Sequence, residues 1–172
     1  MTGLDHDLQQ WVVHHRGEPF DTLFEALSLA GSFGIVWLAI AAVLAVLWRR
    51  PVLLAHVGIA ALASDIVSRL LKEWVGRERP PLRYPEPEPL VHVPDSAAFP
   101  SGHATVAFAC ATVLARAAPR LALPLYVLAA LVAWSRVYVG VHYPLDVLGG
   151  AALGVGLVTG LRWLAAARQR SG

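Results

Sequence analysis

Long apolar stretches, separated by short polar segments, dominate the pattern of this chain. A helix needs about 20 apolar residues to cross the hydrocarbon core of a bilayer, with a range of about 17–25. Backbone groups in lipid must pair within their own segment, so we expect each stretch to be a transmembrane helix. The stretches cover roughly residues 23–48, 51–71, 102–118, 121–139 and 144–166.

Proline and glycine residues lie where these helices are expected to begin, end or break. Pro51 and Pro144 open the second and fifth stretches, where a missing N–H costs little, and Pro119 closes the third. The glycines between residues 31 and 34 would split the first stretch into a half-helix and a span.

The N-terminal segment 1–22 is polar, but one helical face of it is apolar, with Leu4, Leu8, Trp11 and Val12. This pattern is typical of a short helix lying in the membrane interface. The whole pattern predicts an all-α, polytopic transmembrane bundle of five to six spans with an N-terminal interfacial helix, as a single domain over residues 1–172.

The composition supports lipid as the solvent and narrows the partners. Charged residues make up 15% of the chain and hydrophobic residues 56%, whereas soluble domains carry about 25% charged residues. The net charge is +2, but the arginines are scattered at the ends of apolar runs without interleaved aromatics, which argues against nucleic acid. With one cysteine, Cys110, the chain has no disulfide framework.

Three polar motifs interrupt the apolar pattern. They are Lys72 to Arg79-Pro80, then Pro100-Ser101-Gly102-His103, then Ser135-Arg136 with His142 and Asp146. In the five-span arrangement all three fall at the same membrane face, and ionisable residues at such depths are costly and usually serve a site. We therefore expect the motifs to meet.

The cations of these motifs suit a multiply charged anion. Arg79 and Arg136 offer planar forks that match phosphate oxygens, and Lys72 adds a point charge. Ser101 and Gly102 open a helix whose first N–H groups lack internal partners. The sequence therefore predicts a phosphate-binding site.

The two histidines suggest a division of roles. Asp146 follows His142 by four residues and could fix its tautomer, which makes His142 the expected nucleophile. His103 lacks an acidic neighbour in sequence and is the expected general acid, a contribution of about 10²–10⁴-fold. His92 in the loop has no partners for a metal site, so we expect neither a metal nor a cofactor.

Asp65, Arg69 and Lys72 lie at i, i+4 and i+7 on one face of the second stretch. Asp65 and Arg69 are placed to form an ion pair, which would lower the cost of burying either charge. The pair is interpreted as structural, with a supporting role for the site as the alternative.

The three motifs resemble the signature of the phosphatidic acid phosphatase type 2 superfamily at every position. The resemblance implies a membrane lipid phosphatase that works without a metal, through a phosphohistidine intermediate. It implies that His142 takes up the phosphoryl group, that Asp146 orients His142, and that His103 acts as acid and then as base. The residues implied to hold phosphate are Lys72, Arg79 and Arg136, assisted by Ser101 and Gly102.

Two other functions remain open. A lipid phosphotransferase would have the same site, and a non-catalytic lipid-phosphate binder or transporter would need the cations but not the histidines. The substrate is also open among polyprenyl diphosphate, phosphatidylglycerol phosphate, phosphatidate and a polyprenyl-phosphoryl sugar phosphate, as is the oligomeric state.

Orientation follows from the arginines at the other end of the predicted bundle. Positive residues in short loops favour the cytoplasm, so the proline-rich loop 77–100 and the site are expected to be extracytoplasmic. We therefore expect a protein of a bacterial cytoplasmic membrane. The arginines on the predicted cytoplasmic side are Arg49, Arg50, Arg116, Arg120, Arg168 and Arg170.

Overall fold

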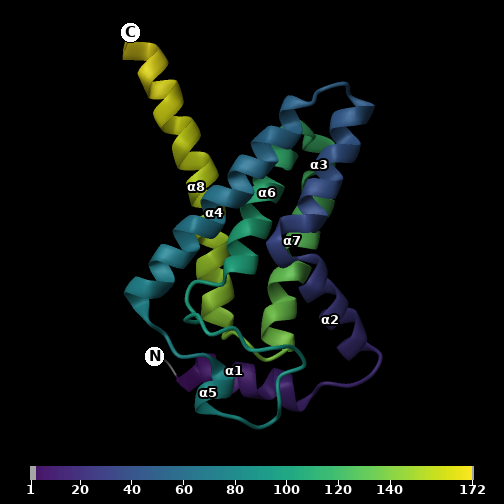
Figure 1. Cartoon of the computed structure of the whole chain (residues 1–172), viewed down its shortest axis with the longest axis vertical. Coiled ribbons are helices and arrows are strands. Elements are labelled where there is room, and N and C mark those ends of the chain that lie inside the picture. Colours follow the sequence, from purple (N-terminus) through teal and green to yellow (C-terminus); the bar gives the residue numbers. More distant parts are fainter. Residues whose placement is uncertain (1–2, 172) are drawn as a thin grey trace.

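The computed structural model describes residues 3–171, and all regular structure in this range is helical, which confirms the all-α prediction. Met1, Thr2 and Gly172 lie outside the described residues. Helix α1 lies across one end of a bundle formed by the longer helices (Figure 1). The elements are α1 (Gly3–His14), α2 (Phe20–Ala30), η1 (Ser32–Gly34), α3 (Ile35–Leu47), α4 (Val52–Val75), α5 (Pro80–Arg83), α6 (Gly102–Ala117), η2 (Pro119–Leu121), α7 (Ala122–Tyr138) and α8 (Pro144–Ser171).

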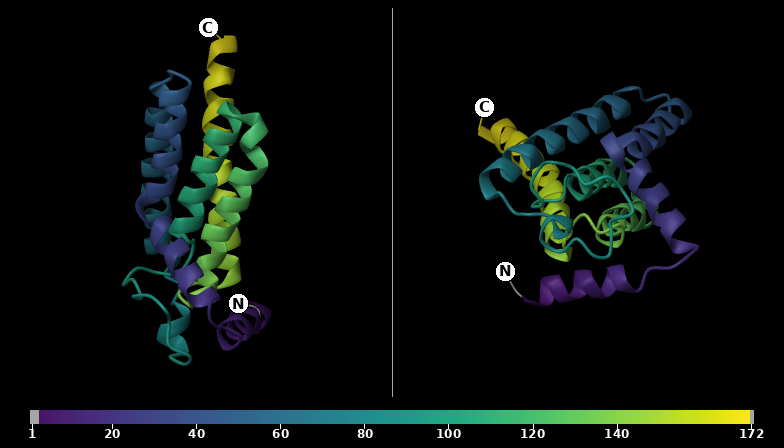
Figure 2. Two further views of the ribbon diagram at one scale, coloured as in Figure 1. Left: turned by 90° about the vertical axis from the view of Figure 1, so that its right-hand side faces the viewer. Right: turned by 60° about the horizontal axis from the view of Figure 1, so that its bottom comes forward.

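Helix α6 forms the centre of the bundle and contacts α4, α7 and α8. Ala104, Ala107, Cys110, Ala111 and Leu114 of this helix are fully buried. A helix that is apolar or small on all sides favours such a central position. The loop between α4 and α6 lies across the same end of the bundle as the start of α6 (Figure 2).

Glycines on α8 allow it to pack closely against the first turns of α6. A Cβ atom at Gly150 would lie 2.5 Å from the carbonyl oxygen of Ser101, and one at Gly154 would collide with the backbone carbonyl of Thr105. The close approach lets the Ser101 N–H donate to the Asp146 carbonyl oxygen at 2.9 Å. The packing of two helices thus brings the second and third motifs together.

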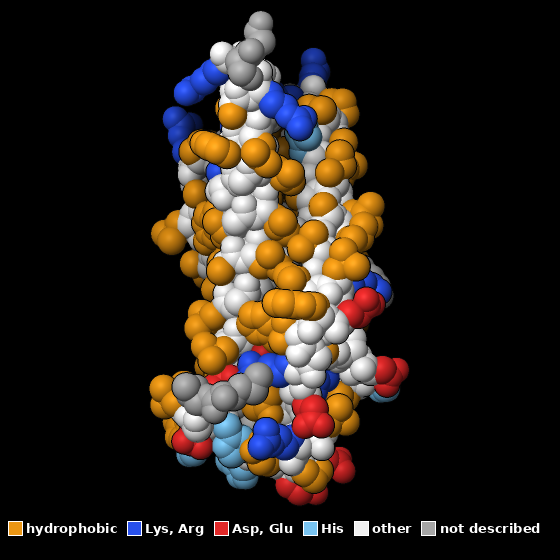
Figure 3. Space-filling model, turned by 90° about the vertical axis from the view of Figure 1, so that its left-hand side faces the viewer, with side chains coloured by type: hydrophobic (Ala, Val, Ile, Leu, Met, Phe, Trp, Pro, Cys, Tyr) orange, Lys and Arg blue, Asp and Glu red, His pale blue; other side chains and the backbone are white. Residues whose placement is uncertain are grey.

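The outer surface of the bundle is apolar between two charged ends (Figure 3). Among the described residues, three segments are long and apolar enough to cross a membrane: Val52–Arg83, Pro119–Tyr138 and Pro144–Arg170. Helices α2 and α3, bent by 66°, make a fourth if they form one broken span. The expected count of five to six spans is not confirmed, because α6 has 16 residues and would reach only about 24 Å of a core about 30 Å thick.

The N-terminal region differs from the expected segment 1–22 in length. Helix α1 ends at His14, and the chain turns before α2 begins at Phe20. The predicted break in the first apolar stretch is confirmed, since η1 separates α2 from α3 and Gly34 has a φ of 72°. The proline-rich loop also contains one helical turn, α5, which Pro80 begins.

We expect Gly154→Val to destabilise the protein by about 1–3 kcal/mol, because the new side chain would overpack the α6–α8 contact. The measurement is the thermal unfolding midpoint in detergent. Gly156→Val is the matched control, since it lies on the same helix and a Cβ there meets nothing within 4 Å. Equal midpoints for the two variants would contradict the close-packing argument.

Candidate active site

Lys72 and Arg79 are held by backbone carbonyl groups of the loop that covers the end of the bundle. Lys72, in the last turn of α4, donates from Nζ to the carbonyl oxygen of Ala97 at 2.6 Å. Arg79 donates from Nε to the carbonyl oxygen of Ser96 at 2.7 Å, and from Nη1 to that of Val141 at 3.0 Å. These neutral acceptors position both cations without cancelling their charges.

Arg136 joins these two cations from the last turn of α7 and donates to Ser28 Oγ of α2. The relative exposures of Lys72, Arg79 and Arg136 are 7%, 2% and 5%. Within residues 3–171, none of the three forms an ion pair with a carboxylate. Burying three unpaired cations is costly unless an anion compensates them, so the cluster is suited to bind a multiply charged anion.

His142 lies in the turn between α7 and α8 and faces the cations with one ring nitrogen. Its Nε2 accepts from Arg79 Nη1 at 3.1 Å, and its Nδ1 lies 3.4 Å from Asp146 Oδ2. The Asp146 carboxylate also accepts from the Tyr143 N–H at 2.9 Å. Burial, and then the positive charges of Arg79 and Arg136, hold the pKa of His142 well below its usual value, so the imidazole is neutral at neutral pH. A neutral imidazole with Nε2 free of a proton is the nucleophilic form.

His103 lies in the first turn of α6, with its Nε2 at 3.3 Å from Ser32 Oγ of η1. Ser32 in turn donates to the carbonyl oxygen of Ser28 at 3.2 Å, and Ser28 Oγ contacts Arg136. The break between α2 and α3 therefore supplies polar contacts to the site.

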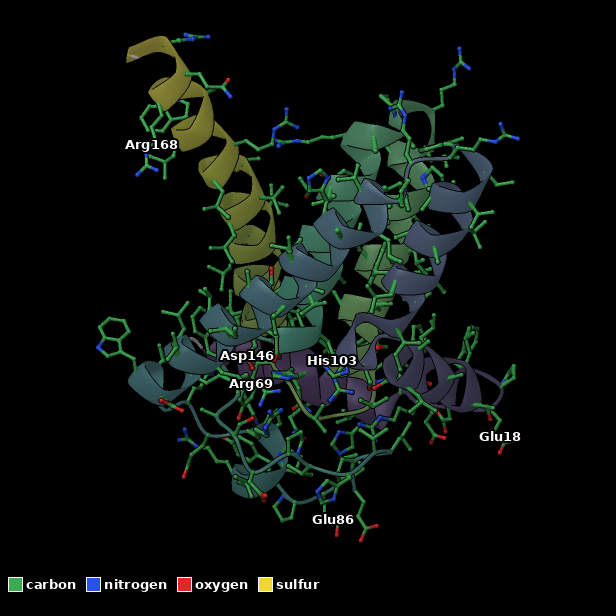
Figure 4. The ribbon with its side chains drawn as sticks, turned by 45° about the horizontal axis from the view of Figure 1, so that its top comes forward. Glu18, Arg69, Glu86, His103, Asp146 and Arg168 are labelled. Atoms are coloured by element: carbon green, nitrogen blue, oxygen red, sulfur yellow. The ribbon has the colours of Figure 1, made fainter. Side chains whose placement is uncertain are left out.

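These groups share a cavity of about 570 Å³. Its polar end is lined by Lys72, Arg79, His103, Arg136 and His142, and Gly102 also lines it. Ser101 is fully buried and not part of the wall, and its hydroxyl has no hydrogen-bond partner among the described residues. Figure 4 shows His103 and Asp146 at the same end of the bundle. The structure therefore brings the two histidines and three cations together, with Asp146 directly behind His142.

Arg77 and Asp5 belong to this region but were not expected there. Arg77 donates from Nη1 to Asp146 Oδ1 and from Nη2 to Asp5 Oδ2 at 2.5 Å, and its guanidinium lies 4.2 Å from the centre of the Tyr143 ring. Asp5 also accepts from the Leu145 N–H at 2.9 Å. Helix α1 is thereby tied to the carboxylate that faces His142.

The sequence held only weak signals for these contacts. Arg77 was one of several loop arginines, and Asp5 belonged to a polar terminal segment. Ser28 and Ser32, one helical turn apart in an apolar stretch, were the clearest unused signal. Within the described part of the chain, no three His, Cys, Asp or Glu side chains gather as a possible metal site.

Comparisons with known proteins agree with this architecture. The chain is 37% identical over 148 residues to a decaprenylphosphoryl-5-phosphoribose phosphatase of Mycobacterium tuberculosis, covering 84% of this chain and 80% of the relative. It is 34% identical over 124 residues to an undecaprenyl-diphosphatase of Sulfolobus acidocaldarius, covering 69% and 58%. The crystal structure of a transmembrane phosphatidylglycerolphosphate phosphatase of the PAP2 type from Bacillus subtilis superimposes with a TM-score of 0.75 at 28% identity, covering 95% of this chain and 85% of that one.

The helical fold and these relatives define an integral-membrane lipid phosphatase. The model of the PAP2 superfamily matches residues 51–170, and the chain belongs to this superfamily. The family resemblance and the enzyme class predicted from the three motifs are thereby confirmed. The roles of the individual site residues stay predictions.

We expect Arg77→Lys to lower kcat about tenfold and to leave KM nearly unchanged. A lysine keeps the charge but loses the planar fork that bridges two carboxylates, so Asp146 would orient His142 less well. The measurement is steady-state phosphate release, with Arg83→Lys, at an exposed position of the same loop, as the control. An unchanged kcat, or a loss confined to KM, would show that Arg77 does not act through Asp146.

Proposed function

We propose that the protein hydrolyses the terminal phosphate of a membrane lipid through a phosphohistidine formed at Nε2 of His142. The observation that carries this proposal is the orientation of the His142 ring. Its Nε2 faces the cation cluster, and its Nδ1 faces Asp146 at 3.4 Å. A bound phosphoryl group would therefore meet a nucleophile whose positive charge, once formed, a carboxylate stabilises.

In the first step, His142 Nε2 attacks phosphorus and the bond from phosphorus to the leaving oxygen breaks. His103, protonated in the complex because the bound phosphate offsets the charge of the neighbouring cations, donates a proton to that oxygen. Lys72, Arg79 and Arg136 stabilise charge on the three non-bridging oxygens. In the second step, His103 takes a proton from water, the water oxygen attacks phosphorus, and the P–N bond breaks. Free phosphate leaves, and His142 returns to its neutral form.

The apolar part of the cavity also indicates what kind of group the substrate carries beyond its phosphate. Beyond the cations it continues along α3 and α4 between the apolar residues Leu38, Gly58, Ala61 and Leu62. A hydrocarbon chain fits such a wall. Because the mycobacterial and archaeal relatives are named for decaprenyl- and undecaprenyl-linked phosphates, we take a polyprenyl-linked phosphate as the substrate class.

The distribution of charge supports an extracytoplasmic site in a bacterial cytoplasmic membrane. Except for Asp65 within α4, the carboxylates of the chain belong to α1, the turn that follows it, α2, the end of α4, the loop after α4 and the start of α8. The opposite ends of the helices carry arginines without carboxylates, as the positive-inside rule requires of the cytoplasmic side. Figure 3 shows Lys and Arg side chains without acidic ones at that end.

We expect His142→Ala to reduce phosphate release to background and to abolish an acid-labile phosphoenzyme. The measurement is rapid acid-free trapping with a lipid labelled in its terminal phosphate. His92→Ala, in the exposed part of the loop, is the control and should retain both signals. EDTA should leave the wild-type rate unchanged, because cations of the chain supply the positive charge.

A phosphoenzyme in the His142→Ala variant would overturn the assignment of the nucleophile. Lipid binding without any phosphoenzyme in the wild type would instead favour a transporter. Label transferred to another lipid, rather than to water, would indicate a phosphotransferase.

We expect Gly58→Leu to raise KM for a long-chain lipid phosphate about tenfold, because its side chain would fill the apolar part of the cavity. The nearest atom to a Cβ at this position is Leu38 Cδ2 at 4.0 Å, so the substitution introduces no backbone clash. The measurement compares KM for the long-chain lipid with KM for a short, water-soluble phosphate ester. A parallel change for both esters would contradict a hydrocarbon-binding role for this wall.

A further inference from the structure

An ion pair between Asp65 and Arg69 also lines the cavity and takes no part in the mechanism above. Arg69 Nε donates to Asp65 Oδ2 at 2.8 Å, and both residues belong to α4. Their side chains are 64% and 40% exposed, and both line the same cavity as the cation cluster. Figure 4 shows Arg69 at the same end of the bundle as His103 and Asp146. The i, i+4 spacing of Asp65 and Arg69 thus forms an ion pair, and the exposed parts of both side chains can contact a ligand in the cavity.

This pair is costly where it lies. Helix α4 belongs to a segment long and apolar enough to cross the membrane, and charged side chains in such segments usually line a functional site. Ser68, on the same helix, is buried and also lines the cavity. Because all three polar side chains line the cavity that contains the cation cluster, a ligand in that cavity would account for them.

The polar side chains of α4 lie at increasing distances from the cation cluster. At about 1.5 Å per residue, Arg69 lies about 4.5 Å and Asp65 about 10 Å along the helix axis from Lys72. Ala61 and Leu62, one further turn along, line the apolar part of the cavity. A substrate that extends from the cations into this part must therefore pass a polar zone roughly two turns long.

We propose that Asp65 and Arg69 bind the hydroxyl groups of a polyol spacer, such as a sugar, between the cleaved phosphate and the lipid anchor. The proposal rests on the proposed function and specifies its substrate. A paired carboxylate and guanidinium present acceptors and donors side by side, which suits hydroxyl groups because each hydroxyl both donates and accepts. Hydrogen bonds to charged partners are also stronger than those to neutral ones.

A diphosphate directly attached to the lipid fits this zone less well. Its second phosphate is joined to the first through one oxygen, so it stays near Lys72 and leaves the Asp65 carboxylate facing hydrocarbon. A second phosphate placed deeper would instead meet the negative charge of Asp65. The polar zone therefore favours a spacer over a bare diphosphate.

The test compares two lipids with the same polyprenyl chain: the polyprenyl-phosphoryl pentose 5-phosphate, which has a sugar spacer, and the polyprenyl diphosphate, which has none. The quantity measured is the ratio of their kcat/KM values. We expect the wild-type ratio to favour the spacer lipid, and Asp65→Asn or Arg69→Gln to lower this ratio about 10- to 100-fold. Because kcat/KM for both lipids is measured on the same preparation, partial unfolding of a variant lowers both values equally and leaves their ratio unchanged.

Glu73→Gln is the matched control, since Glu73 is exposed on the same helix and does not line the cavity, and its ratio should equal that of the wild type. An unchanged ratio in both the Asp65 and Arg69 variants, or a wild-type preference for the diphosphate, would overturn the spacer site while leaving the phosphatase intact. A wild-type protein that hydrolyses neither lipid would instead count against the polyprenyl substrate class itself.

Discussion

Among residues 3–171, three buried cations have no carboxylate partner, and the site is built around them. Lys72, Arg79 and Arg136 come from the ends of two helices and an adjoining loop, and their like charges repel one another. Backbone carbonyls and one serine hydroxyl hold them in place. Such an arrangement is favourable only when an anion of comparable charge completes it, and this requirement explains why the loop and the helix ends converge at one depth.

Arg77, in contrast, is a buried cation that forms ion pairs with carboxylates of the same chain. It bridges two carboxylates, Asp5 and Asp146, so its charge is cancelled within the chain. The contrast separates two roles for buried positive charge: Arg77 fixes the scaffold behind His142, whereas Lys72, Arg79 and Arg136 leave their charge available to a ligand. It also makes α1 part of the support of the site, although its outward face carries exposed Leu4 and Trp11.

The site was more predictable from the sequence than the span count. The apolar stretches ended at Lys72 and near Arg136, and began at Ser101 and Pro144, so successive helices of alternating direction were expected to bring these residues to one end. The contacts of Asp5 and Arg77 were not predictable, because residues 5, 77 and 146 are joined by packing and not by any local period. Helix α6 misled the count for a related reason: its apolar residues face neighbouring helices, and burial in protein and burial in lipid give the same pattern.

The most direct test of the uncompensated cluster is inhibition by orthovanadate, which resembles the five-coordinate phosphoryl group, in the presence of EDTA. We predict competitive inhibition of the wild type, with an inhibition constant about 10- to 100-fold weaker in Arg136→Gln. Arg83→Gln, which removes an exposed charge of the loop, should leave this constant unchanged. Equal inhibition of all three proteins would contradict the account, because the anion would then not be held by the buried cations.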